Sequence, residues 1–314
     1  MRDRARDFLK ECGFDEFEII DSLADASSRE YYRILVDSKS YILMDSSMMR
    51  DALENFVMMA DKLSLAKVRV PKILKRDLSA GYLLLEDFGS THLFDVISYD
   101  DVEKLYKKAI SEIVLIQKSS IESLEIYDRE FLKFEMDLML EWYIKQYHNI
   151  SLDDSDLSII STTIEAILDE VLSQKSGVVV HRDFHSKNLM ILKDNSIGVI
   201  DFQDAKVGSV TYDLVSLLRD SYVKLDEDFI DKMLAFYLDE SGLDVSFEEL
   251  KRWFDFMGLQ REIKILGIFA RLSLRDGKDG YLEYIPQTLE YIVDVGSRYS
   301  LTKELATLLL KIKK

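Results

Sequence analysis

Residues 178–204, VVVHRDFHSKNLMILKDNSIGVIDFQD, constrain the fold more than any other stretch of this chain. Three valines at its start predict a short buried strand, and the chain turns polar abruptly at His181. Two further apolar runs, 189–192 and 197–200, are separated by the turn signal Lys-Asp-Asn-Ser and predict a hairpin. The stretch therefore predicts a strand, a polar loop and a hairpin in one tight unit.

Three oxygen-bearing side chains, Asp183, Asn188 and Asp201, stand at the strand ends of this unit, where loops can aim them into a cleft. Such oxygens suit Mg²⁺, which takes few protein carboxylates and completes its octahedron with phosphate oxygens and water. The order His-x-Asp-x-x-x-x-Asn, with Asp-Phe thirteen residues after the Asn, is also the spacing of the kinase catalytic loop and its metal-binding aspartate. The unit therefore predicts a phosphoryl-transfer site.

The charge balance of the chain limits its partners. Its 314 residues carry 41 Lys and Arg against 58 Asp and Glu, a net charge of −17. Nucleic acid and anionic membrane surfaces need basic patches, so we expect neither as a partner, whereas a small-molecule substrate is compatible. The length suffices for one large domain or two lobes, and we expect a monomer or a weak oligomer.

The compartment is predicted from cysteine usage and from the N-terminus. Cys12 is the single cysteine, so no intrachain disulfide forms and a reducing compartment fits. The first 13 residues read as a charged amphipathic helix ended by Gly13, not as a signal peptide. No apolar run approaches the length of a membrane span. We therefore expect a cytoplasmic protein.

Apolar periodicity divides the chain into a strand-rich first part and a helical remainder. The first part is predicted to hold an amphipathic helix over 48–66 and strands over about 17–25, 29–37, 40–46, 72–78 and 82–85. The remainder is predicted to hold a last helical pair near Pro286 and helices over 100–118, 126–148, 154–173, 228–239 and 246–275. The predicted fold class is α+β.

The catalytic stretch resembles that of the aminoglycoside phosphotransferase and choline kinase group of small-molecule kinases, which are relatives of protein kinases. The resemblance rests on the motif above and on His185, two residues after Asp183, where protein kinases usually carry Lys. It implies that Asp183 is the catalytic base and that His185 lies near the transferred phosphate. It also implies that Asn188 and Asp201 hold Mg²⁺.

Two further residues flank this loop. The resemblance implies that Asp213, near the start of the next helix, supports the loop from behind. His181 is interpreted as a structural, hydrogen-bonded histidine.

The resemblance also implies a two-lobed, protein-kinase-like fold with a small, mainly antiparallel β N-terminal lobe and a larger, mainly helical C-terminal lobe. Residues 86–89, EDFG, are then the hinge segment whose backbone pairs with adenine. Glu86 and Phe88 are expected beside the nucleotide. We place the lobe boundary at this segment, giving an ATP-binding lobe at 1–88 and a catalytic and substrate-binding lobe at 89–314.

Two features depart from the kinase pattern. The turn expected to cover the ATP phosphates has no glycine; Ser27 and Ser28 are its candidate phosphate contacts, and a plain solvated hairpin is the alternative. Met44 stands where kinases carry the phosphate-pairing Lys, which leaves Glu54 of the following helix without its usual partner. Arg33 on the neighbouring strand is the candidate replacement cation.

Three longer blocks resemble a narrower group, the bacterial sugar kinases that phosphorylate the anomeric hydroxyl of N-acetylmuramate and N-acetylglucosamine in cell-wall recycling. These blocks are LLLEDFG, IDFQDAKVGSVTYDLVSLLRDSYV and LQREIKILGIFARLSLRDGKDGYL. The likeness covers most of the chain, and relatives in this group also lack the strand Lys. It implies an ATP- and Mg²⁺-dependent phosphotransferase that acts on an N-acetylated amino sugar in peptidoglycan recycling.

The lactyl carboxylate of N-acetylmuramate gives one independent expectation. An acidic protein holds such a group with local cations, preferably arginine. The candidates lie after the catalytic unit: Arg219, Arg261, Lys264, Arg271 and Arg275. Surface ion pairing with the abundant acids is the alternative for each of them.

Three other functions stay open on the sequence. An aminoglycoside or choline-type kinase would share the fold and the chemistry, and the net charge of −17 favours its cationic substrate. A metal-dependent hydrolase would use His181, Asp183 and His185 as ligands. A non-catalytic pseudokinase would explain Met44 and the glycine-free turn, although the three motif oxygens are all present.

Overall fold

A computed structural model describes residues 3–23, 29–49, 51–97 and 101–312. By its contacts the chain divides into two compact units, each described here by itself. The strand unit comprises residues 1–120 and 187–205, and the helical unit comprises residues 121–186 and 206–314. The α+β fold class, with a small antiparallel sheet and a larger helical part, is confirmed.

The strand unit is built on one antiparallel sheet in the order β1-β2-β3-β5-β4. Its strands are β1 Glu18–Leu23, β2 Glu30–Val36, β3 Lys39–Asp45, β4 Ile73–Asp77 and β5 Tyr82–Glu86. All five lie where apolar runs predicted them. Asp37 and Ser38, with φ of 46° and 65°, make the two-residue turn between β2 and β3, as the right-handed twist of a tight hairpin requires.

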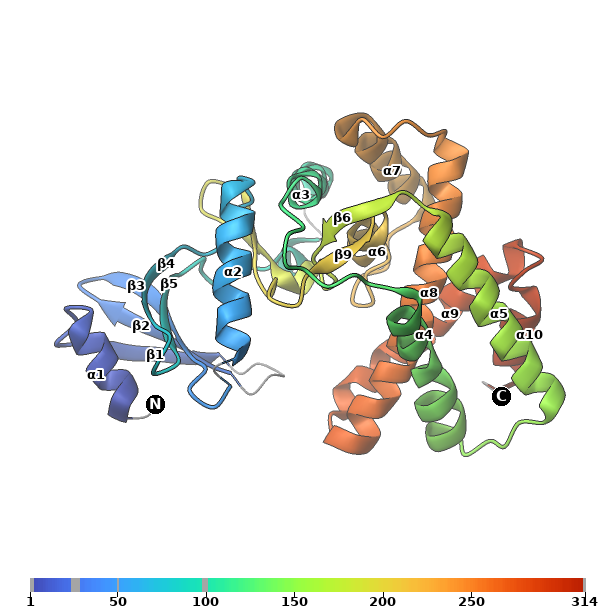
Figure 1. Cartoon of the computed structure of the whole chain (residues 1–314), viewed down its shortest axis with the longest axis horizontal. Helices are drawn as coiled ribbons and strands as arrows, with labels where there is room; N and C mark the ends of the chain where they lie inside the picture. The colour runs from blue at the N-terminus through green and yellow to red at the C-terminus, as the bar shows by residue number, and fades with distance from the viewer. Residues whose placement is uncertain (1–2, 24–28, 50, 98–100, 313–314) are drawn as a thin grey trace. The chain divides into compact units, whose positions relative to one another are not determined.

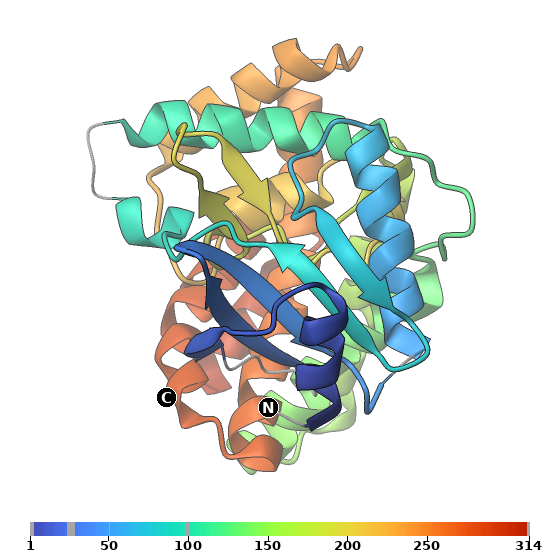
Figure 2. The ribbon, with the colours of Figure 1, turned by 90° about the vertical axis from the view of Figure 1, so that its left-hand side faces the viewer.

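Two helices flank this sheet. Helix α1, Asp3–Glu11, packs Phe8 and Leu9 onto the sheet side chains Tyr32, Leu43 and Tyr82. Figure 1 shows α1 on one side of the sheet and α2, Asp51–Leu65, on the other, and Figure 2 shows α1 in front of the strands. Because neighbouring residues of a strand face opposite ways, the side chains of β3 alternate between these two faces.

The predicted hairpin completes the strand unit. Its strands are β7 Leu189–Ile191 and β8 Ile197–Val199, paired antiparallel from Leu189 opposite Val199. Backbone bonds tie it to the first part of the chain: Val199 N donates to Arg69 O at 2.7 Å, and Ile191 N to Thr91 O at 2.8 Å. Helix α3, Val102–Gln117, and a short 3-10 helix, η1 Leu93–Val96, belong to the same unit.

The helical unit is organised around α8, Phe247–Asp276, which contacts most of the other helices of this unit. Those helices are α4 Arg129–Leu138, α5 Asp154–Ser173, α6 Tyr212–Leu218, α7 Glu227–Ser241, α9 Ile285–Arg298 and α10 Lys303–Ile312. The middle of α8, Phe254–Ile265, is buried around its whole circumference, which is typical of a central helix. Side chains of Asp128, Asp153 and Ser246 cap α4, α5 and α8 as expected for N-caps.

The helix predicted over 126–148 is wrong in two details. It begins only at Arg129, because Tyr127 N donates to Val207 O at 2.8 Å in a strand-like contact. After Leu138 it continues as the π-helix η2, Met139–Tyr147, with a 3.1 Å bond from His148 N to Tyr143 O. A Cβ on Gly267 of α8 would lie 2.3 Å from the Leu138 carbonyl carbon, so α8 packs against this junction at backbone distance.

One strand of the helical unit was not predicted. The valine strand is β6, Ser176–Val180, and it pairs antiparallel with β9, Lys206–Ser209, a run of four residues. Alternation cannot be recognised over so short a run, and Gly208 weakens the pattern further. Gly208 is required there, since a Cβ would lie 2.9 Å from the Val180 side chain.

The compact units group residues 89–120 and 187–205 with the sheet. The predicted lobe boundary at 88/89, at the expected nucleotide hinge, stays a prediction.

Among the described residues, no helix is both long and apolar enough to span a bilayer. A late helical pair is present as α9 and α10, with Pro286 in the first turn of α9.

Candidate active site

The loop after β6 lies in the helical unit and is held from behind by Asp213. This buried carboxylate, in the first turn of α6, accepts hydrogen bonds from His181 N at 2.7 Å and from Arg182 N at 3.0 Å. Burial raises the pKa of Asp213, while its contacts with His181 and Arg182 oppose the rise. Arg182 has φ of 78°, an uncommon conformation for a side chain of this size, and the two bonds stabilise it. The geometry fits the supporting role expected of Asp213.

Asp183 follows directly, and its carboxylate is surrounded by cations. Burial favours the neutral acid, but the positive charges of Lys264, Arg182 and Arg261 outweigh it, so the pKa of Asp183 lies below its ordinary value. The group is therefore ionised at neutral pH and can accept a proton. Asp183 N also donates to His181 Nδ1 at 3.3 Å, which gives His181 the structural hydrogen bond expected of it.

Glu135 joins a buried charge network next to Asp183 and was not predicted from the sequence, whereas its partner Lys264 was a candidate cation. Glu135 of α4 lies 2.8 Å from Arg182 and 2.9 Å from Lys264, and it also accepts the Tyr127 hydroxyl. Lys264 donates to the Tyr212 hydroxyl at 3.1 Å. An acid inside the apolar stripe FLKFEMDLML was the available signal, because a buried Glu requires cationic partners.

His185 follows Asp183 by two residues on the same loop. Burial lowers its pKa to about 4, although Asp220 and Asp183 act against this, so the imidazole is neutral at pH 7. Its ring lies edge-on to Tyr222, with ring centroids 5.2 Å apart. The Asp220 carboxylate accepts hydrogen bonds from Ser186 N and Tyr222 N, each at 2.8 Å. These bonds fix the loop to the segment after α6.

The predicted metal ligands lie in the strand unit, since the chain passes from the helical unit to the strand unit between Ser186 and Lys187. Asn188 Nδ2 lies 3.4 Å from Asp201 Oδ2, and Gln203 Nε2 donates to Asp201 Oδ1 at 2.7 Å. The structure therefore brings Asn188 and Asp201 together.

This donor set fits Mg²⁺. One carboxylate and one amide oxygen match an ion that takes most of its ligands from water and phosphate. Within the described ranges, no group of three or more His, Cys, Asp or Glu side chains is arranged to hold a metal. A hydrolase site built on His181, Asp183 and His185 therefore gains no support from the geometry.

The hinge segment 86–89 is fixed by two bidentate ion pairs. Arg69 binds Glu86 at 2.5 and 2.8 Å, and its guanidinium lies 4.6 Å from the centroid of the Phe88 ring. Arg33 binds Asp87 at 2.8 and 3.2 Å and donates to Gly89 O at 2.6 Å. Arg33 is thus committed to the hinge segment, and its predicted phosphate contact gains no support here. Gly89 has φ of 87°, which glycine adopts without strain.

The remaining nucleotide-side predictions have different outcomes. Ser27 and Ser28 lie outside the described residues. Met44 is fully buried between Tyr31 and Leu83 of the neighbouring strands, and by alternation it faces away from α1. Glu54 on α2 is exposed. The Lys–Glu pair of ordinary kinases is therefore replaced by an apolar contact and a solvated acid.

The four candidate arginines are not brought together. Arg219 binds Glu227 at 2.5 Å and stacks on Tyr291, and Arg275 pairs with Asp276 at the surface. Arg271 is half-buried, and burial together with the charge of Arg275 lowers its pKa. Arg261 alone among them is fully buried and numbers among the charges that lower the pKa of Asp183.

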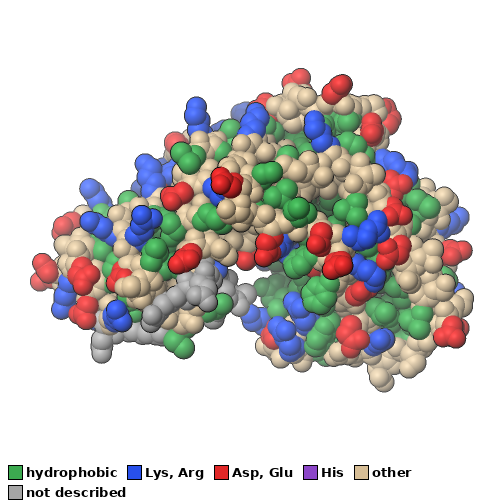
Figure 3. Space-filling model, viewed as in Figure 1, with side chains coloured by type: hydrophobic (Ala, Val, Ile, Leu, Met, Phe, Trp, Pro, Cys, Tyr) green, Lys and Arg blue, Asp and Glu red, His purple; other side chains and the backbone are tan. Residues whose placement is uncertain are grey.

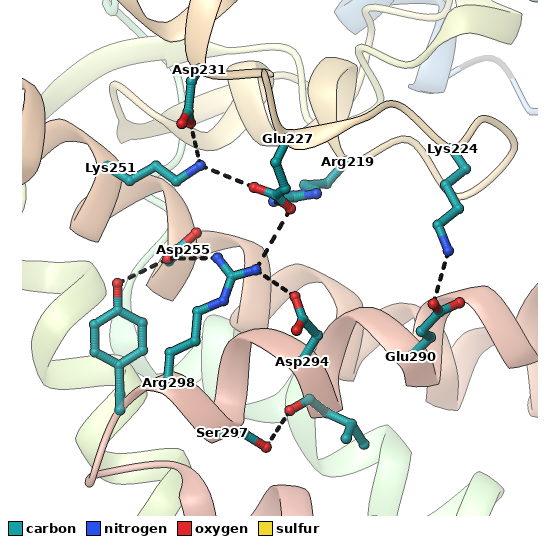
Figure 4. Close-up of polar contacts among 12 residues, drawn as sticks. Arg219, Lys224, Glu227, Asp231, Lys251, Asp255, Glu290, Asp294, Ser297 and Arg298 are labelled. Atoms are coloured by element: carbon teal, nitrogen blue, oxygen red, sulfur yellow. Dashed lines mark hydrogen bonds and ion pairs between the residues drawn. The ribbon is translucent and has the colours of Figure 1, made fainter. Parts of the chain in front are cut away.

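The surroundings of Arg219 are acidic. It lines a cavity of about 280 Å³ together with Asp226, Glu227, Glu262, Glu290 and Asp294. Figure 4 shows that Glu227, Asp255 and Asp294 are bound by Arg298, and that Lys251 reaches Glu227 and Asp231. Elsewhere on the molecule, Figure 3 shows acidic and basic side chains mixed over the surface of each unit. The acidic surroundings of Arg219 therefore disfavour the binding of an anionic group there.

Comparison with known proteins gives a consistent result. Residues 20–248 match the model of the phosphotransferase enzyme family. The chain is 35% identical over 308 residues to an N-acetylmuramate/N-acetylglucosamine kinase of Neisseria meningitidis serogroup B, covering 95% of this chain and 91% of that protein. It is likewise 35% identical over 298 residues to the kinase of the same name from Pseudomonas aeruginosa, covering 93% and 88%.

Solved structures with the same fold are more distant in sequence. The ADP-bound aminoglycoside phosphotransferase APH(2'')-Ib superposes with a TM-score of 0.65 at 17% identity, covering 94% of this chain and 99% of that one. An ethanolamine kinase of Plasmodium vivax superposes with a TM-score of 0.60 at 13% identity, covering 92% and 84%. These likenesses concern the fold, which is the kinase-like fold predicted.

Proposed function

We propose that this chain, which belongs to the phosphotransferase enzyme family, transfers the γ-phosphoryl group of ATP to the anomeric hydroxyl of an N-acetylated amino sugar. The acceptor is N-acetylmuramate or N-acetylglucosamine, and the setting is peptidoglycan recycling in the cytoplasm. The observation that carries this proposal is the 35% identity, over 95% of the chain, to a kinase named for these two sugars.

The residues of the catalytic loop suit the chemistry. The sugar oxygen forms a bond to the γ-phosphorus, the bond from that phosphorus to the bridging oxygen breaks, and ADP leaves with the electron pair. Asp183, ionised because of its cationic surroundings, takes the proton of the attacking hydroxyl. The anomeric hydroxyl is the most acidic of a sugar, so a carboxylate base suffices. His185, neutral at pH 7, is available as a hydrogen-bonding partner.

Asn188 and Asp201 are the residues that would hold Mg²⁺. When bound, the ion neutralises negative charge on the phosphate oxygens. The hydrogen bond donated by the Gln203 side-chain amide fixes one carboxylate oxygen of Asp201 and leaves the other turned toward Asn188. Such outer hydrogen bonds orient metal ligands and raise their affinity. Asp201→Ala is therefore expected to abolish turnover while the folded state persists.

Arg261 is the best-supported partner for a lactyl carboxylate. It lies 3.4 Å from Glu262, a long contact for a charge-assisted pair, so this partner does not use up its five donors. Its charge acts on Asp183 and Asp220. Arg261→Ala is expected to weaken N-acetylmuramate turnover about tenfold to a hundredfold more than N-acetylglucosamine turnover. Arg275→Ala is the matched control, since Arg275 is exposed and pairs with Asp276.

The experiment is a substrate panel. The protein is incubated with Mg·ATP and N-acetylmuramate, N-acetylglucosamine, glucose, aminoglycosides or choline, and the phosphate is located by ³¹P NMR. Phosphate at the anomeric oxygen of an N-acetylated sugar is the expected result. Phosphate on another hydroxyl, or turnover only with cationic acceptors, contradicts the proposal.

A cationic acceptor is the second candidate. It is favoured by the acid-lined cavity of about 280 Å³ beside Arg219 and by the net charge of −17. An aminoglycoside or choline-type kinase would place an ammonium group in this cavity, where it would compete with the cations that already bind the acids. The same panel separates the two candidates, because only one of them predicts turnover of an uncharged sugar.

A further inference from the structure

Four aromatic side chains form a continuous series that starts at His185. The Tyr222 ring lies 5.2 Å from that of His185, Tyr284 lies 5.0 Å from Tyr222, and Phe269 lies 6.0 Å from Tyr284. Tyr281 stacks on Phe269 at 5.5 Å. We call Tyr222, Phe269, Tyr281 and Tyr284 the aromatic cluster. Its members come from the segment after α6, from α8 and from the 3-10 helix η4, Asp279–Tyr284.

The exposure of the cluster differs from that of core aromatics in the same unit. Tyr143, Tyr237 and Phe254 are fully buried, as expected for packing. Phe269 is buried beneath the cluster, but its three tyrosines keep part of their surface in solvent. Partly exposed aromatic faces beside reacting groups are typical of ligand sites, where apolar walls surround a few placed polar atoms.

The cluster shares the electrostatic surroundings of the catalytic loop. Burial raises the pKa of the Tyr222 hydroxyl, with Tyr281, Asp220 and Asp183 adding to the rise and Arg261 opposing it. The hydroxyl is therefore protonated at neutral pH and can both donate and accept a hydrogen bond. Because the chain fixes Tyr222 N to Asp220, and Asp220 to Ser186 N, this ring moves with the catalytic loop.

We propose that the aromatic cluster is the acceptor-side wall of the active site and receives the C–H face of a pyranose ring. The inference rests on the proposed function and adds to it the contact that binds the sugar. Tyr222 and Tyr284 are the contacting rings, and Phe269 and Tyr281 hold them in place. The electron-rich face of an aromatic ring attracts the weakly positive C–H groups that one face of a pyranose presents, and apolar area is buried at the same time.

A cationic ligand fits this wall less well. Quaternary ammonium groups also bind aromatic faces. Here the buried cation Arg261 acts on Tyr222, while Asp220 is engaged by two backbone amides and Asp183 has Lys264 beside it. A second positive charge would be repelled by Arg261, whereas an uncharged ring would not. The wall therefore selects for a neutral sugar ring.

The wall predicts a pattern of sugar specificity that differs from that of Arg261. Both N-acetylated sugars share the pyranose face, so loss of the wall weakens both equally. Loss of Arg261 weakens turnover of the sugar with a carboxylate more than turnover of the other sugar. The two contributions are therefore separable in one set of measurements.

The experiment compares Tyr284→Ala, Tyr222→Ala and Tyr284→Phe with wild type. KM is measured for each sugar and for ATP, and equilibrium binding is measured for methyl N-acetylglucosaminide, which has no anomeric hydroxyl to phosphorylate. We expect the two alanine variants to raise the sugar KM and the glycoside Kd about five- to twentyfold and to leave the ATP KM within twofold. Tyr284→Phe retains the ring, so its sugar KM and glycoside Kd should lie below those of Tyr284→Ala.

Tyr147→Ala is the matched control. Tyr147 is a partly exposed tyrosine of the same unit whose ring packs on Tyr143 and His148. If Tyr284→Ala fails to fold, Tyr284→Leu, which keeps bulk but no aromatic face, replaces it. Unchanged sugar KM and glycoside Kd in the alanine variants overturn the inference while the proposed function stands. The opposite outcome is also distinguishable. If the wild type binds the glycoside but phosphorylates no sugar, and Tyr284→Ala weakens glycoside binding, the proposed function is refuted and the inference about the wall stands.

Discussion

The two units differ in where they place charged side chains. In the helical unit, the loop that carries Asp183 is surrounded by buried ions, with Glu135 between Arg182 and Lys264. In the strand unit, the position where kinases place a buried Lys is occupied by Met44, packed in an apolar sheet. At its hinge segment, Arg69 and Glu86 form an ion pair that is partly solvated, and Arg33 binds the buried Asp87.

The difference shows which half of a phosphotransferase depends on fixed charge. A catalytic base must stay ionised while it is shielded from water, and nearby cations favour its charged form. A nucleotide can instead be held largely by backbone groups and a metal ion. We therefore expect substitutions of charge to be severe around Asp183, and insertion of charge to be severe around Met44.

The largest effect is expected for Asp183→Asn. The amide cannot accept the hydroxyl proton, so kcat should fall roughly 10²–10⁴-fold, while the Kd for Mg·ATP changes little. Single-turnover kinetics and nucleotide titration measure the two quantities. Asp228→Asn, at an exposed site in the first turn of α7, is the control. Activity within a few-fold of wild type would remove Asp183 as the base.

Glu135→Leu is expected to destabilise the helical unit by about 3–5 kcal/mol. The substitution leaves Arg182 and Lys264 buried without the carboxylate that both of them bind. Urea unfolding, followed by circular dichroism, gives the change in midpoint. Glu141→Leu removes an exposed acid that pairs with Lys145 and should cost less than about 1 kcal/mol. Equal losses for both variants would mean that buried and exposed ions contribute alike.

Met44→Lys tests the other side of the comparison. A buried ammonium group in an apolar sheet is expected to destabilise the strand unit by about 2–4 kcal/mol, whereas Met44→Leu should cost less than about 1.5 kcal/mol. Thermal unfolding of the two variants measures the difference. A stable Lys variant with a lowered KM for ATP would instead show that this position faces the nucleotide.

The smallest effect concerns Glu112 of α3. Burial raises the pKa of this carboxyl to about 7, although Arg69 N donates to it at 3.2 Å. The folded state then binds more protons than the unfolded state between about pH 4.5 and 7, so stability declines as the pH rises through this window. Glu112→Gln keeps the acceptor for Arg69 N and removes the charge.

The free energy of unfolding of this variant should vary less with pH, by on the order of 1–3 kcal/mol across the window. Chemical denaturation at pH 4.5 and pH 7 measures the change. Parallel curves for wild type and variant would show that Glu112 is ionised in the folded state throughout.

The motif block could be predicted because its information is local. Strand, loop and hairpin signals lie within 178–204, and the structure places Asn188 beside Asp201 and fixes the loop with Asp213. The turn at Gly89 was also recognisable, since a glycine closely follows a buried strand there. In both cases a short stretch carries the pattern and the turn residues together.

The rest depends on contacts between distant parts of the chain. Arg33 meets Asp87 only after the sheet has formed, and Glu135 meets Lys264 only after α4 packs on α8. Neither pair has a signal in its own neighbourhood beyond an acid in an apolar stripe. The aromatic cluster is similar, since Tyr222 and Tyr284 belong to separate segments.

The discontinuous strand unit has a consequence for synthesis of the protein. A ribosome releases the sheet with α2 and α3 first, but the hairpin that bonds to Arg69 and the Phe202 ring that packs on Phe56 come only after residues 121–186. Until then the nascent sheet exposes apolar surface, a state prone to aggregation. A fragment ending at residue 120 would keep the same surface exposed permanently, because the strand unit is complete only once residue 205 has been made.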